Sequence, residues 1–175
     1  ACGLELDLRP THLLPMTTRL RRLLFLFALG ASAVAAEPAE IDWLKLLPPA
    51  DLKAMQDAPP VDHNAPGAPT GFQFSGTVPE MDGQSGRIAG YIVPIETDAE
   101  GKLSEFFLVP YFGACIHLPA PPPNQIVHVA LPEPIEMTDI YAPYWVAGTV
   151  KIQRHNDELG ASAYAMTAAT VTRWE

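Results

Sequence analysis

Hydrophobic residues recur at every second position through much of the chain from residue 72 onward. This period of two is typical of β-strands, in which successive side chains point to opposite faces. Turn-forming residues bound each such run, which strengthens the prediction. The predicted strands cover residues 72–78, 87–95, 103–109, 125–130, 144–154 and 161–174.

Turn signals separate these strands. Met81-Asp82-Gly83-Gln84 and Asp98-Ala-Glu-Gly101 predict two turns, and residues 155–160 predict the hairpin connection between the last two strands. Ahead of the strands, residues 50–57 predict a short helix. Residues 58–71 are rich in proline and glycine, which favours an extended linker over a packed element.

Short strands with turn signals at regular spacing predict a small, partly closed β-barrel. Gly90 and Gly148 lie in the middle of strands, where glycine often marks a bulge or a barrel corner. We therefore expect a mainly β, OB-fold-like barrel with a short N-terminal helix. A β-sandwich is the alternative. The fold by itself does not identify a function.

The first residues have the pattern of a secretory signal peptide. Arg19, Arg21 and Arg22 precede the apolar run 23–34, and the small residues 33–36 fit a processing site. A start at Met16 gives this signal ordinary proportions. The run is too short for a comfortable membrane span. We therefore expect residues 1–35 to be an extension plus signal, 36–71 an N-terminal segment and 72–175 the barrel, in a periplasmic protein without a stable membrane span.

Removal of the signal changes the charge and the cysteine content. The segment before Ala36 holds four of the 11 basic and two of the 20 acidic residues, so the net charge changes from −9 to −11. Such a balance excludes nucleic acid as an expected partner and suits the handling of cations. Cys115 becomes the only cysteine, which excludes an internal disulfide.

Cys115 and His117 are the strongest candidates for metal binding or for a chemical reaction. In an extended segment they point to the same side, and thiolate and imidazole are both preferred zinc ligands. The remaining ligands would come from His63, His128, His155 or nearby carboxylates. Two alternatives remain open, namely a buried cysteine with His117 bonded to a backbone carbonyl, or a reactive thiol activated by His117.

The other histidines have simpler expected environments. His63 is expected in solvent, and His155 as an exposed turn residue. His128 alternates with Ile126 and Ala130 on one strand face and is expected as a core histidine whose polar atoms are hydrogen-bonded.

A proline run follows the Cys-x-His pair. Proline favours a stiff polyproline II path, and such segments can dock on aromatic grooves of a partner. Asn124 and Gln125 can bond backbone groups that the prolines leave without donors. The predicted partner-binding residues are Pro119, Pro121, Pro122, Pro123, Asn124 and Gln125.

Several segments resemble the DUF3299 family of exported bacterial proteins. The resemblance rests on Gly90-Tyr-Ile-Val-Pro94, on the run from Glu105 to His117 and on the prolines up to Gln125, and it extends over residues 41–171. Ala120 interrupts a proline run that is often longer in the family. The resemblance implies an association with ABC transporters of zinc homeostasis, and zinc binding in which only Cys115 and His117 match the family motif.

Two functions follow as hypotheses. The first is a periplasmic zinc-binding accessory protein that works with a metal ABC transporter or with another periplasmic metal-binding protein. The second is an exported interaction module that docks a transporter or membrane partner through its proline-rich loop. No catalytic constellation is recognisable, so we do not expect an enzyme.

Overall fold

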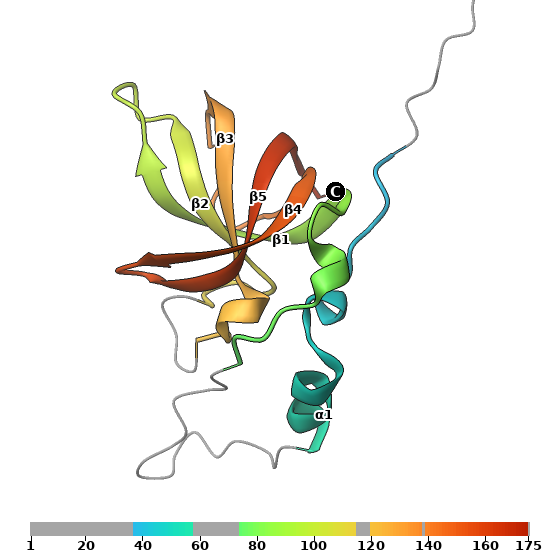
Figure 1. The fold of residues 1–175 in the computed structure, drawn as a ribbon. Coiled ribbons are helices and arrows are strands. Elements are labelled where there is room, and N and C mark those ends of the chain that lie inside the picture. Colours follow the sequence, from blue (N-terminus) through green and yellow to red (C-terminus); the bar gives the residue numbers. More distant parts are fainter. Residues whose placement is uncertain (1–36, 58–73, 115–119, 138, 175) are drawn as a thin grey trace, which may run out of the picture. The chain divides into compact units, whose positions relative to one another are not determined.

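The computed structural model describes residues 37–57, 74–114, 120–137 and 139–174. Five strands form a closed barrel in the order β1-β2-β3-β5-β4, with β4 pairing back onto β1 (Figure 1). The pairing of β3 with β5 is parallel and the other pairings are antiparallel. This five-stranded arrangement is OB-fold-like and confirms the predicted fold class. The strands are β1 Ser85–Thr97, β2 Leu103–Val109, β3 Val127–Ile135, β4 Pro143–Asp157 and β5 Gly160–Arg173.

The strand predictions fail at one segment and fall short at several strand ends. Residues 74–78 do not form the predicted strand. Two of their backbone groups bond to side chains instead, since the Gly76 carbonyl accepts from Asn124 and the Val78 amide donates to the Tyr164 hydroxyl. These bonds satisfy the backbone without a neighbouring strand. The rest of the predicted segment, like residues 58–71, lies outside the described residues.

The barrel core consists of the alternate residues of each strand that point inward. β1 shows the pattern clearly, with buried and partly buried positions alternating from Gly86 to Val93. The largest fully buried inward side chains include Ile88, Phe106, Leu108, Val127, Val129, Val146, Tyr164 and Met166. Gly148 lies at a register shift between β4 and β5, as expected of a mid-strand glycine.

The segment before the barrel closes one end of the core. The 3₁₀ helix η1 (Trp43–Leu46) places Leu46 in the main cluster, and Ile41 joins the same cluster. The Trp43 indole donates to the Ala89 carbonyl at 2.7 Å. α1 (Pro49–Asp57) follows with no buried residue. Residues 37–175 therefore form one compact unit by their contacts.

Asn124 joins three parts of this unit. It lies in the 3₁₀ helix η3 (Pro123–Gln125) and is fully buried. Its Nδ2 donates to Asp51 Oδ2 and to the Gly76 carbonyl, both at 3.0 Å. None of the helices in the described ranges is long and apolar enough to cross a membrane.

Replacement of Asn124 by alanine should destabilise the protein by about 2 kcal/mol, because the Gly76 carbonyl and the Asp51 carboxylate lose the donor that the buried Asn124 side chain provides. The exposed residue Asn156 provides the matched control, and Asn156→Ala should change the free energy of unfolding by less than about 0.5 kcal/mol. Urea denaturation of both variants measures the difference. Equal stabilities would contradict the role assigned to Asn124.

Candidate metal-binding site on the outer face of the barrel

The outward face of β2 and β3 carries the most concentrated polar chemistry of the barrel. Phe106 and Leu108 point into the core, so Glu105 and Phe107 point outward from β2. His128 on β3 is the direct partner of Phe107 in the antiparallel ladder. Side chains of directly paired residues emerge on the same face, which places His128 beside both β2 residues.

His128 is held by a carboxylate. Its Nε2 lies 2.9 Å from Glu105 Oε2, and its side chain is only 11% exposed. This bond fixes the orientation of the ring. The expected hydrogen bond is present, but the expected core position was wrong, because His128 lies partly buried on the outward face and belongs to neither apolar cluster. Sequence reasoning did not identify Glu105, because a register shift between Leu103 and Glu105 interrupts the alternation along β2.

His155 stacks directly on His128. The two ring centroids are 3.8 Å apart and the planes differ by 3°. Phe107 presents an edge-on contact to both rings, at 5.8 Å from His155 and 6.1 Å from His128. Together, Glu105, Phe107, His128 and His155 form what we call the histidine site.

The expectation of an exposed turn histidine at position 155 was wrong. β4 continues to Asp157 and β5 begins at Gly160, so the turn is confined to the two residues between them. The Asp157 carboxylate accepts from the Leu159 amide and stabilises this short turn. A register shift between Ile152 and His155 changes the course of the strand just before the histidine. His155 is therefore partly buried in a strand.

A second apolar cluster lies beside the histidine site. It contains Phe107, Val109, Ala114 and Ile126, and each of these is at most 2% exposed. Gly160 at the start of β5 lies close to two of its members, since a Cβ there would be 3.8 Å from Ile126 and 4.0 Å from Phe107. Ala114 is the last described residue before Cys115 in the sequence.

The described part of the proline run does not have the exposure that partner docking needs. Pro121 and Pro122 are buried, as are Asn124 and Gln125. The Gln125 amide donates to the Trp43 carbonyl at 2.9 Å, and Asn124 bonds to Asp51 and Gly76. The contacts of these four residues are internal, and partner binding through them stays a prediction. Pro123 is partly buried at the start of η3, and Pro119 lies outside the described residues.

A comparison with protein families gives one decisive result. The family profile described as "Protein of unknown function (DUF3299)" matches residues 43–173, a range that includes every strand and the whole histidine site. The chain belongs to the DUF3299 family. This confirms the resemblance at the level of the family.

A solved DUF3299 structure agrees with this membership. The chain is similar to a DUF3299 family protein from Pseudomonas aeruginosa PAO1, with 39% sequence identity and a TM-score of 0.61. The similarity covers 79% of this chain and 97% of the other. A search of curated proteins gives no match.

In this DUF3299 chain, the predicted metal ligands divide into two groups. His128 and His155 meet at the histidine site, whereas Cys115, His117 and His63 lie outside the described residues. Among the residues that are described, no group of three His, Cys, Asp or Glu side chains could hold a metal ion. The histidine site by itself therefore does not offer a complete set of metal ligands.

The ligand types of the histidine site fit zinc, but the stacked arrangement of the two rings does not fit the binding of one zinc ion by both. Imidazole is a preferred zinc ligand, and a carboxylate behind it is the usual supporting group. A metal ion lies near the plane of each imidazole that binds it. Two stacked parallel rings share no such point, so joint binding of one ion requires one ring to turn.

Proposed function

We propose that this protein is an exported, zinc-binding accessory protein that acts with a metal ABC transporter. The observation that carries the proposal is the meeting of His128 and His155, from distant parts of the sequence, on a face where Glu105 already bonds one of them. Two adjacent imidazoles with a carboxylate are the types of ligand that suit a borderline-soft cation such as Zn²⁺.

The remaining ligands in this proposal are Cys115 and His117. Cys115 directly follows Ala114, which is buried in the cluster that includes Phe107. Phe107 in turn contacts both stacked histidines. Ligands from this segment would complete a mixed thiolate and imidazole shell of the kind that zinc prefers. The thiolate and neutral imidazoles compete with protons, so zinc binding should weaken as the pH falls.

Charge and targeting support the same proposal. The chain without its first 35 residues carries a net charge of −11, which raises the local concentration of cations. The signal-like sequence of the N-terminus supports a periplasmic location, where metal transporters collect their cargo. The association with an ABC transporter of zinc homeostasis rests on the family resemblance of the Cys-Ile-His segment.

Zinc affinity of single variants tests the proposal. We expect Cys115→Ser, His117→Ala, His128→Ala and His155→Ala each to weaken zinc binding by at least about tenfold, and Glu105→Gln to weaken it by about tenfold through the loss of ring support. Competition with a chromogenic chelator measures the dissociation constants, and metal analysis measures the stoichiometry.

Two controls make this result specific. Glu133→Gln removes a carboxylate from the same strand as His128 but away from the histidine site, and it should leave the zinc affinity unchanged. His63→Ala tests the linker histidine on its own. If zinc binds equally well to the wild type and to the double variant His128→Ala/His155→Ala, the assignment of the histidine site is wrong.

The transporter association needs a separate experiment in cells. A strain that lacks this protein should grow poorly in medium depleted of zinc, and the wild-type gene should restore growth while the Cys115→Ser gene should not. Full restoration by Cys115→Ser would contradict a role of the metal site in transport, even if the purified protein binds zinc.

A further inference from the structure

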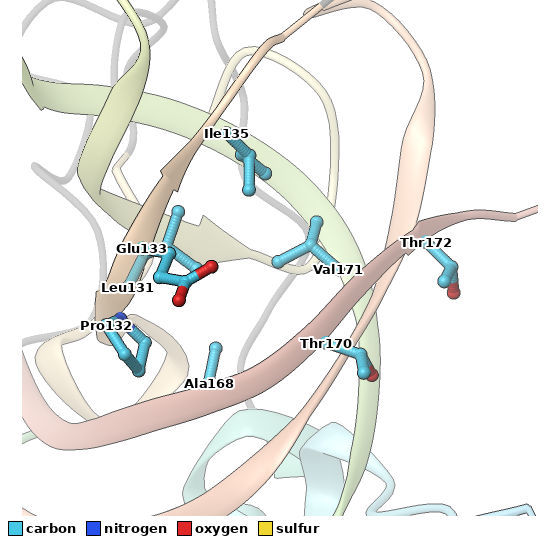
Figure 2. Close-up of a pocket in the computed structure, with 8 residues that line it drawn as sticks. All are labelled: Leu131, Pro132, Glu133, Ile135, Ala168, Thr170, Val171 and Thr172. Atoms are coloured by element: carbon cyan, nitrogen blue, oxygen red, sulfur yellow. The ribbon is translucent and has the colours of Figure 1, made fainter.

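The wall of the barrel has an opening between the second half of β3 and the end of β5. The parallel pairing of these strands joins residues 127–130 to residues 164–167 and ends there. β3 continues to Ile135, while β5 continues in its pairing with β4 to Arg173. A pocket of about 440 Å³ lies between the two separated strands (Figure 2).

The lining of this pocket is mainly apolar. Leu131 and Ile135 from β3 and Val171 from β5 are partly buried against the main core, and Ala168 belongs to that core. Figure 2 shows the side chains of Leu131, Ile135 and Val171 directed toward the space between the strands. The volume lies within the range of small-molecule sites, which combine apolar walls with a few placed polar groups.

Among the described residues, Glu133 is the only charged one that lines the pocket. It lies two residues from Leu131 and two from Ile135 along β3, so these three side chains leave the strand on the same side. In Figure 2 its carboxylate lies in the opening, across from Val171. Within the described residues it forms no ion pair. A carboxylate among apolar side chains selects a ligand that carries a positive charge.

We propose that the pocket between β3 and β5 binds a small organic cation, namely a primary amine attached to a short apolar body. The ammonium group would pair with Glu133, and the apolar body would contact Leu131 and Val171. The acidic surface of the protein favours the approach of such a cation. The proposal is independent of zinc binding, because none of its residues belongs to the histidine site.

A purely protective role is the competing explanation for Glu133. A strand edge without a partner is prone to pair with other chains, and prolines and inward-pointing charges prevent this. Pro132 and Pro134 flank Glu133 on β3 and fit that role. In that case, the pocket would show no preference for an amine over a carboxylate of the same length.

Binding of hexylamine, hexanoate and 1-hexanol to the full chain separates the two explanations. We expect saturable amide shifts in NMR spectra at Leu131, Ala168 and Val171 with hexylamine, and weaker binding of hexanoate. Glu133→Gln should weaken hexylamine binding about fivefold, the effect of one partly exposed ion pair, and should leave 1-hexanol binding unchanged. Glu133→Lys should invert the preference in favour of hexanoate.

Glu136→Gln is the matched control, because Glu136 is exposed just after β3 and does not line the pocket. It should bind hexylamine like the wild type. The proposal is overturned if hexylamine produces no saturable shifts, if its shifts map away from the pocket, if hexylamine and hexanoate bind equally, or if Glu133→Gln has no effect. Zinc affinity should be the same in the wild type and in the three variants at Glu133 and Glu136. A failure of amine binding therefore does not bear on the proposed metal site.

Discussion

Gly148→Ala should destabilise the protein by about 3 kcal/mol, near the upper end for overpacked core positions. A Cβ at this position would lie 2.3 Å from the Thr167 carbonyl oxygen and 2.9 Å from the Met166 side chain. The oxygen belongs to the backbone of β5, so it cannot move without disturbing the β4–β5 ladder. Urea denaturation at neutral pH measures this effect as a lower midpoint with an unchanged slope.

The matched control for Gly148 is Gly160, at the other end of the same pair of strands. A Cβ at Gly160 meets its nearest neighbours at 3.8 and 4.0 Å, which are ordinary contact distances. Neither glycine has a positive φ angle, so backbone strain does not enter the comparison. Gly160→Ala should change the stability by less than about 1 kcal/mol. If the two variants are equally stable, the close approach of β5 to Gly148 does not prevent a larger side chain at that position.

Tyr164→Phe should lower the free energy of unfolding by about 3 kcal/mol, because two backbone groups lose their partner at once. The buried Tyr164 hydroxyl donates to the Leu46 carbonyl at 2.9 Å and accepts from the Val78 amide at 2.7 Å. Phenylalanine fills the same space and removes only the oxygen. Tyr141 is 70% exposed, so Tyr141→Phe serves as the control and should be nearly neutral.

Tyr164 also predicts how stability changes at high pH. Burial raises the pKa of Tyr164 above its ordinary value of 10.0, against a smaller opposing effect of the hydrogen bond from Val78. Above pH 10 the unfolded chain therefore releases this proton while the folded protein keeps it, and stability falls as the pH rises toward the folded pKa. The difference in unfolding free energy between Tyr141→Phe and Tyr164→Phe should shrink across this range. A constant difference would contradict the prediction.

Alternation of hydrophobic residues was sufficient to predict the barrel strands and their fold class. β2 has the predicted bounds, because Leu103–Val109 lies between a clear turn and Pro110. The segment 74–78 has a similar pattern, but its hydrogen bonds go to Asn124 and Tyr164. Those partners are distant in sequence, so a local pattern cannot reveal them. Periodicity thus identifies which residues can form a strand and not whether a neighbouring strand is available.

The candidate site was harder to predict because its residues come together only through pairing between strands. His128 lies next to Glu105 because of the β2–β3 register. His155 reaches His128 because β4 continues past a register shift that no turn signal marks. The histidines were found from their residue type, whereas Glu105 lacked any such signal. Knowledge of the register would have identified the pair formed by Glu105 and His128.

The contact between the beginning and the end of the barrel unit has a consequence for folding during synthesis. Tyr164, near the C-terminus, bonds to Leu46 in η1, and β5 is also the strand that joins β3 to β4. During synthesis from the N-terminus, the chain therefore cannot complete the barrel until β5 has left the ribosome. Until then, the inward faces of the earlier strands remain uncovered and prone to aggregation. Closure of the barrel consequently has to wait for β5.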